Sequence, residues 1–282
     1  MRCLAVALSL LGALTLATTA ARATPCDTSN GLAGVPIRVP FGAADFGVLP
    51  EACAATSLSL ETRGALALAT EDFYGALLGG AGLRIRWTFA EGPWLSIWIP
   101  GLELRLVANA SLQPTSVDLG AGALGAHFPL RLADTAQLAS SVRLLVPTET
   151  VLRTAARTGV ELAESVVWNA APRLELVGGL ALPMVVAVAG GRAHSTFVPT
   201  LSADASVRVS GWLTLSAGLA LRVAAARDHA FESLDPRLAL RFAPWRTMNA
   251  DLSVALPSLG RDRTDVAGLL TLAWVIEAGM ER

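Results

Sequence analysis

The sequence has no lysine, and no long apolar run follows its first residues. All 22 basic residues are arginine and 23 residues are acidic, so the chain lacks both the basic field that attracts nucleic acid and a polyacidic tail. No later segment has the roughly 18 uncharged apolar residues that a membrane-spanning helix needs. Hydrophobic residues still make up 53% of the chain, which indicates that they follow a pattern other than a continuous run.

Cysteine and histidine are also scarce, with three of each. They are too scattered for a metal site, and we expect no metal and no cofactor. His127 lies alone near an expected turn, and a hydrolase would need His194 or His229 within hydrogen-bond reach of a serine or aspartate. We therefore expect no catalytic residues and no enzyme activity.

Residues 1–23 have the features of a secretory signal peptide. Arg2 supplies a positive start, an apolar core follows, and Ala21-Arg22-Ala23 forms a small-x-small cleavage site. We expect cleavage after Ala23. A retained anchor is the alternative, although the core lacks the amphipathic pattern that such an anchor would show.

Residues 24–56 form an irregular stretch that keeps two cysteines in the exported chain. An even number of cysteines outside the cytoplasm predicts one disulfide, Cys26–Cys53, with two free thiols as the alternative. We interpret the stretch as a periplasmic N-terminal extension, folded back by this disulfide. A second interpretation places it as a plug inside the lumen of the domain that follows.

From residue 57 to the end at 282, short stretches repeat in which every second residue is apolar. The run from Leu201 to Ser210 is the clearest copy, with Asp204 and Arg208 on the polar side. Successive side chains of a β-strand point to opposite faces, so each stretch predicts a strand with one apolar and one polar face. We expect twelve strands, near 58–68, 83–89, 102–106, 117–123, 138–146, 160–168, 174–182, 201–210, 213–222, 238–242, 248–254 and 266–276.

Details of single strands carry further expectations. The third strand is expected to reach back to Trp94 through a bulge at Pro100-Gly101. On the fourth strand we expect Val117, Leu119, Ala121 and Ala123 to share the apolar face. Long connections alternate with short turns along the series, which is typical of an up-and-down antiparallel transmembrane β-barrel. The predicted fold is therefore all-β, as a single barrel of about 12 strands.

Alternation alone does not say whether the apolar face points inward or outward. The tryptophans favour the outward choice, because all seven fall at the turn end of the predicted strands and indole prefers the lipid headgroup layer. We predict that they form an interface girdle: Trp87, Trp94, Trp98, Trp168, Trp212, Trp245 and Trp274. A secreted soluble β-sandwich or a lipocalin-like barrel is the alternative.

Two segments add a resemblance at the level of a protein class. Pro40-Phe41-Gly42-Ala43-Ala44-Asp45-Phe46-Gly47 and Asp72-Phe73-Tyr74-Gly75 resemble segments of uncharacterised exported barrels from GC-rich soil bacteria. With the alternation and the tryptophan rim, most of the mature chain resembles Gram-negative outer-membrane β-barrel proteins. The resemblance implies outer-membrane lipid and the barrel-assembly machinery as partners. Such barrels usually finish on an aromatic residue, whereas this chain ends at Arg282 with Trp274 further back.

The predicted inward face is rich in charge, with acids and arginines mixed within and between strands. Its lumen-lining residues are Arg63, Arg84, Arg86, Arg105, Arg143, Arg208, Arg222, Arg237, Arg241, Glu61, Glu103, Asp118, Glu161, Glu175, Asp204 and Asp251. One interpretation is a porin-like conduit for small polar solutes, with weak anion preference. The other is a closed lumen in which arginine–carboxylate pairs hold the wall in shape and outer loops contact partners. The sequence leaves the oligomeric state open.

Overall fold

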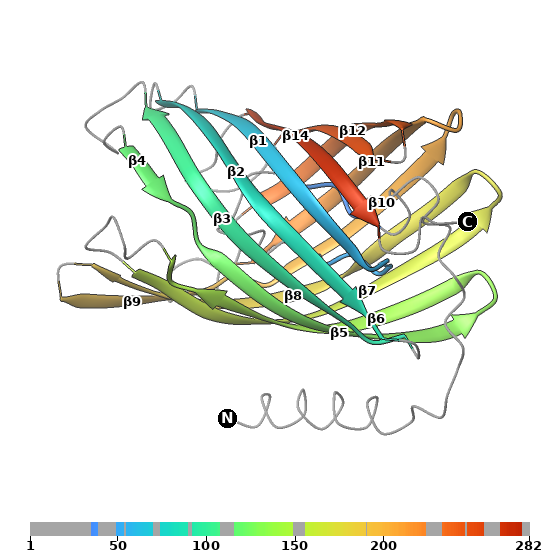
Figure 1. Ribbon diagram of the computed structural model, residues 1–282, viewed down its shortest axis with the longest axis horizontal. Helices are drawn as coiled ribbons and strands as arrows, with labels where there is room; N and C mark the ends of the chain where they lie inside the picture. The colour runs from blue at the N-terminus through green and yellow to red at the C-terminus, as the bar shows by residue number, and fades with distance from the viewer. Residues whose placement is uncertain are drawn as a thin grey trace.

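The computed structural model is a closed, tilted barrel of antiparallel strands (Figure 1). It describes residues 35–38, 49–53, 55–69, 74–89, 92–107, 116–148, 156–189, 191–223, 233–245, 247–256 and 266–277. Within these ranges no helix is long and apolar enough to cross a membrane. The strands are β1 (Ser57–Ala69), β2 (Tyr74–Thr88), β3 (Trp94–Val107), β4 (Ser116–Leu119), β5 (Gly122–Ala133), β6 (Ala136–Val146), β7 (Ala156–Ala171), β8 (Leu174–Ala189), β9 (Arg192–Phe197), β10 (Thr200–Arg208), β11 (Leu213–Arg222), β12 (Ser233–Trp245), β13 (Met248–Ala255) and β14 (Val266–Glu277).

These strands form a barrel of twelve wall strands, because β4 and β5 together make one wall strand and β9 and β10 make another. Each wall strand pairs with the next in chain order, and β14 pairs with β1 to close the barrel. The up-and-down barrel of about twelve strands predicted from the alternation is therefore confirmed. The strand predicted to reach back to Trp94 also does so, with a register shift in the β2–β3 pairing beside Gly101.

The two faces of the wall have opposite chemistry, as the period of two requires. Exposed leucines occur on most strands of the barrel, and Leu102, Leu219 and Leu238 are more than half exposed. Small and polar side chains point inward and are buried, as in β10, where Ser202, Asp204 and Ser206 alternate with exposed Leu201 and Val207. An apolar exterior around a polar interior is the arrangement of a membrane barrel, and it is the reverse of a soluble one.

The fourth wall strand, made of β4 and β5, differs from the prediction. Val117 is exposed, but Ala121 and Ala123, expected on the same apolar face, are buried. This wall strand is interrupted between β4 and β5, where the Gly120 amide donates to the Gly101 carbonyl at 3.2 Å. Gly120 and Ala121 lie between the two strands, and beyond them exposed Leu124 and Phe128 show that the alternation runs in the opposite phase.

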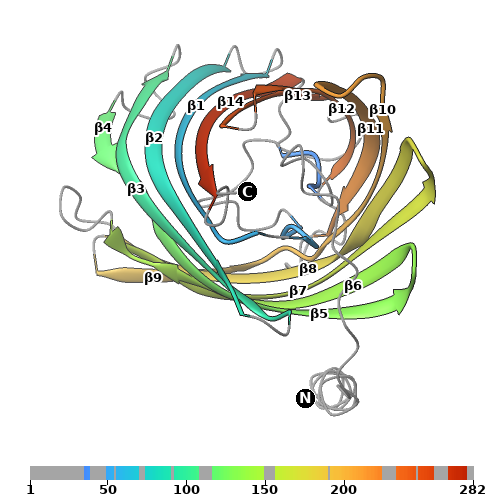
Figure 2. The same cartoon turned by 45° about the vertical axis from the view of Figure 1, so that its right-hand side comes forward.

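The N-terminal segment also lies elsewhere than predicted in its described parts, residues 35–38 and 49–53. They lie inside the ring of strands, as the blue stretches of Figure 2 show. Ile37 and Ala52 are fully buried, and the Ile37 amide donates to Asp204 Oδ2 at 3.0 Å. The Ala52 carbonyl accepts from Gln137 Nε2 at 2.7 Å. The periplasmic placement is thus wrong for these residues, because the inward-facing polar groups of the wall bind their backbone.

The rest of that stretch is outside the described residues, as is the predicted signal peptide 1–23. Cys53 is buried beside Ala139 and Val167. Cys26 lies outside the described residues, so the Cys26–Cys53 disulfide stays a prediction. The last strand ends at Glu277, close to the Ile276 that the alternation indicated.

Candidate functional site: the charged interior of the barrel

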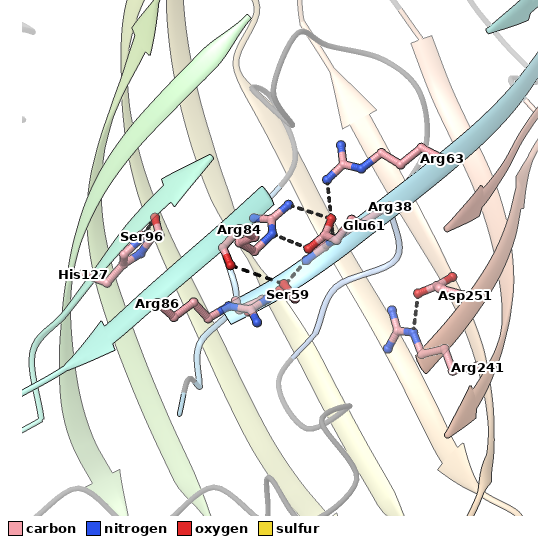
Figure 3. A network of polar contacts seen from close by, with 11 residues as sticks. Arg38, Ser59, Glu61, Arg63, Arg84, Arg86, Ser96, His127, Arg241 and Asp251 are labelled. Carbon is pink, nitrogen blue, oxygen red and sulfur yellow. Dashed lines mark hydrogen bonds and ion pairs between the residues drawn. The ribbon is translucent and has the colours of Figure 1, made fainter. Parts of the chain in front are cut away.

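One group of charges lies on the inner side of β1 and β2 and is named here the β1–β2 charge cluster. It consists of Arg38, Glu51, Glu61, Arg63, Arg84 and Arg86. Glu61 is almost fully buried and is the centre of the cluster (Figure 3). Arg84 donates to its two oxygens through Nε at 2.5 Å and Nη2 at 3.3 Å, and Arg63 Nη2 donates to Oε2 at 2.8 Å. Such charge-assisted forks hold a carboxylate firmly where water is scarce.

Glu51 is the second carboxylate of this cluster, and it comes from the N-terminal segment. Arg86 Nη2 donates to its Oε1 at 2.6 Å, and Arg38 of the same segment donates to the same oxygen. Burial acts to raise the pKa of Glu51, but Arg86 and Arg38 outweigh burial and lower that pKa below its ordinary value. Glu51 is therefore a carboxylate anion at neutral pH.

Trp98 forms the aromatic floor of the cluster. The guanidinium carbon of Arg63 lies 4.5 Å from the ring centroid and that of Arg84 lies 5.3 Å away. Both contacts fall within the range of cation–π attraction. Trp98 is buried with Ala121, Ala123 and Leu145, so the ring is fixed from behind while it orients the two arginines.

A second group, the β10–β13 charge cluster, lies on another part of the inner wall. Its members are Asp204, Arg222, Asp235, Arg237, Arg241 and Asp251. Each arginine donates through Nε to one aspartate: Arg222 to Asp235 at 3.0 Å, Arg237 to Asp204 at 2.9 Å and Arg241 to Asp251 at 3.0 Å. Three arginines and three aspartates balance here, whereas the β1–β2 cluster has four arginines against two glutamates.

The N-terminal segment binds this second cluster through its backbone. Asp204 accepts from the Ile37 amide, and Arg237 Nη1 donates to the Ile37 carbonyl at 3.4 Å. Ser253 on β13 donates to the Arg38 carbonyl. Residues 35–38 thus bridge the interior from β10 to β13, and the side chain of Arg38 reaches Glu61 on β1 at 3.7 Å.

His127 is not alone, contrary to the expectation from sequence. Its Nε2 lies 2.9 Å from Ser96 Oγ and its Nδ1 lies 2.8 Å from Ser141 Oγ, while Trp94 stacks on the ring at a centroid distance of 3.5 Å. His194, one of the two histidines considered for a hydrolase, lies exposed on β9, and His229 is outside the described residues. The sequence could not pair Ser96, His127 and Ser141, because they come from three strands.

Two tryptophans depart from the predicted girdle. Trp94 and Trp98 are buried inside the barrel, 4% and 8% exposed, because they alternate with outward-facing Leu95 and Ile97. Trp87, Trp168, Trp212, Trp245 and Trp274 are exposed and lie in or beside the short connections at the ends of their strands, or near the end of β14. The girdle prediction thus fails for Trp94 and Trp98, which instead contact His127 and the arginines.

The predicted lumen-lining residues fall into four groups. Glu61, Arg143, Glu161, Asp204, Arg237 and Arg241 are buried. Arg63, Arg84, Arg86, Arg208, Arg222, Glu175 and Asp251 are half-buried, and Glu103 is exposed. The side chains of Arg105 and Asp118 are outside the described set. Beyond the two clusters, Arg143 Nε donates to Glu161 Oε1 at 2.7 Å.

Sequence reasoning missed three charged members of these clusters: Arg38, Glu51 and Asp235. Asp235 alternates with Ser233 and Arg237 on β12, so its spacing was a usable signal. Arg38 and Glu51 lie in the irregular stretch, where no periodicity indicates an orientation. Among the described residues, no group of three or more His, Cys, Asp or Glu side chains could hold a metal ion.

No protein-family model matches the chain, and no curated protein sequence matches it. Among solved structures, an outer-membrane channel from Pseudomonas putida F1 has a TM-score of 0.59 at 13% identity, covering 84% of this chain and 100% of the channel. The beta domain of the Bordetella autotransporter BrkA has a TM-score of 0.50 at 10% identity, covering 80% of this chain and 100% of that domain. The translocator domain of the autotransporter NalP from Neisseria meningitidis has a TM-score of 0.50 at 10% identity, covering 78% and 88%.

At these identities the likeness concerns the fold. The fold is that of outer-membrane β-barrel proteins, and the apolar outer face requires a lipid environment. The protein is accordingly an outer-membrane β-barrel.

Proposed function

We propose that this protein is an outer-membrane conduit for small polar solutes, with an arginine-rich lumen that its own N-terminal segment obstructs at rest. One observation carries the proposal: a closed barrel keeps buried arginines and carboxylates on its inner wall, together with residues 35–38 and 49–53. Fixed charges inside a barrel set which solutes enter, and an excess of arginine favours anions.

Planar-bilayer conductance of the refolded protein tests this proposal. Two chains should be compared, one starting at Thr24 and one lacking residues 24–53, which leaves β1 and its pairing with β14 intact. The shortened chain should carry a larger current, because the segment that lies among the wall charges is gone. In a potassium chloride gradient its reversal potential should indicate chloride preference.

The second candidate is a structural or surface-interaction barrel with a closed lumen. The direct pairing of acids with arginines, such as Glu161 with Arg143, favours it, because such pairs stabilise a wall without any passage. Absence of current from both folded chains in every salt would overturn the conduit and favour this candidate. Equal current from both chains would mean that the segment does not obstruct the lumen.

Several finer features belong to the same proposal. Residues 1–23 act as a cleaved signal peptide, and a Cys26–Cys53 disulfide ties back the N-terminal segment. The outward tryptophans at the short turns face the periplasmic headgroup layer, where indole is favoured. The barrel-assembly machinery inserts the chain into outer-membrane lipid, and no catalytic role is assigned.

A further inference from the structure

Glu51 occupies the inner wall in the way that a bound ligand would. It is the only described carboxylate of the β1–β2 charge cluster that is not part of a strand. Glu51 is 8% exposed, and its Oε1 atom accepts a hydrogen bond from Arg86 at 2.6 Å. Arg86 and Arg38 each donate through Nη2 to the same Glu51 oxygen, and charge-assisted hydrogen bonds of this kind are stronger than neutral ones.

The charge count on the wall itself points to an anion. Strands β1 and β2 contribute Arg63, Arg84 and Arg86 to this cluster but only one carboxylate, Glu61. The N-terminal segment contributes the other carboxylate, Glu51, together with Arg38. Within this cluster Arg86 pairs with the carboxylate that the segment brings, so a displaced Glu51 would leave a cation on the wall that attracts another anion.

The surroundings of Glu51 form a pocket rather than a flat surface. With Glu51 in place the pocket has a volume of about 30 Å³, so the Glu51 side chain leaves room for little more than a water molecule. Its lining combines arginines with aromatic and hydroxyl groups and includes Arg84, Arg86, Trp94, Ser96, Trp98, His127 and Arg143. A few convergent polar groups among rigid aromatic rings are typical of a small-molecule site. Trp98 orients Arg63 and Arg84, so the cations are placed in advance.

We propose that the wall around Arg84 and Arg86 is a binding site for the carboxylate group of small organic acids, and that Glu51 is its resident occupant. This rests on the proposed conduit function and names organic anions as its solute class. A solute carboxylate would take the place of the Glu51 carboxylate on Arg86 as it passes the segment.

Chemical rescue tests the site directly in the full-length mature chain. The Glu51→Ala variant loses the two-carbon carboxylate end of the side chain, which has the size of acetate. Apparent Tm of the refolded barrel should be measured in sodium acetate, and in sodium chloride and acetamide as controls for ionic strength and shape. We expect acetate alone to raise the Tm of Glu51→Ala by several degrees and to saturate, because a ligand bound only by the folded state stabilises it.

Three further arms make the result decisive. Wild type, with Glu51 in place, should respond to acetate no more than to chloride. Glu164→Ala removes an outward-facing acid that accepts a hydrogen bond from Ser140, and its Tm should not respond to acetate. Adding Arg86→Gln to Glu51→Ala should shift the acetate midpoint upward about tenfold or more, because a charged donor is lost.

Equal responses of wild type and Glu51→Ala, or no response of a folded Glu51→Ala barrel, would overturn the site. If Glu51→Ala folds poorly, the yield of refolded barrel becomes the readout: a yield restored by acetate supports the site, and a yield equal in acetate and chloride overturns it. Rescue by acetate in a barrel that never carries current would support the binding site and overturn the conduit function. Conduction without rescue would keep the conduit and remove organic acids as its solute class.

Discussion

Trp98 and Trp245 represent two regions of the barrel that treat the same side chain in opposite ways. Trp98, inside β3, is 8% exposed and lies against Arg63 and Arg84, whereas Trp245, at the β12 turn, is 65% exposed. On the inner wall the aromatic ring is buried against charged side chains. On the outer rim the ring is exposed to the surroundings of the barrel. The difference teaches that position along a strand does not decide the role of a residue, while its phase in the alternation does.

The largest effect should come from replacing the inner ring. Trp98→Ala leaves a cavity beside Ala121 and Leu145 and removes the floor under two arginines, so we expect a loss of about 3–5 kcal/mol in the free energy of unfolding. Denaturant unfolding in lipid vesicles measures this loss. Trp245→Ala is the matched control on the rim and should lose less. Equal losses would remove the distinction between the two regions.

A charge placed on the outer face should come next in size. Leu219 is 52% exposed near the middle of β11, so Leu219→Arg puts a guanidinium into hydrocarbon. We expect a loss of about 2–4 kcal/mol in the free energy of unfolding. Leu219→Val keeps the site apolar and should change stability little. A tolerated arginine at this position would mean that the outer face does not contact lipid.

Glycines on the two faces provide the finest comparison. A Cβ at Gly179, on the inner side of β8, would lie 1.9 Å from the Glu164 carbonyl oxygen, whereas a Cβ at Gly64, on the outer side of β1, would meet no atom within 4 Å. Gly179→Ala should therefore cost about 1–3 kcal/mol, because backbone must move to admit the methyl group. Gly64→Ala should stay within about 0.5 kcal/mol of wild type in the same unfolding assay. A reversed order would show that the inner face is the looser one.

The alternation predicted most of the barrel, because the period of two is local and each strand has one lipid-facing side. It also held the signal for the inner tryptophans: Trp94 and Trp98 alternate with Leu95, Ile97 and Ile99, so phase places them inward. Grouping them with the rim by their position at a turn overrode that signal.

Other features had no local signal. The lumen position of Glu51 depends on Arg86 in β2, and that of Ile37 depends on Asp204, which is 167 residues away in the sequence. Such contacts exist only once the barrel has closed, so no window of the sequence contains them.

The seam between β1 and β14 has a consequence for the timing of biogenesis. These strands pair along nearly their whole length, from Ser57 with Glu277 to Leu68 with Val266. The first strand to be synthesised therefore has no partner on this edge until the last strand has been made. During that interval both edges carry unpaired backbone groups that invite pairing with other chains. Pairings between such distant segments also form slowly. A chain whose synthesis stops before β14 is complete would therefore keep both edges open to such wrong pairings.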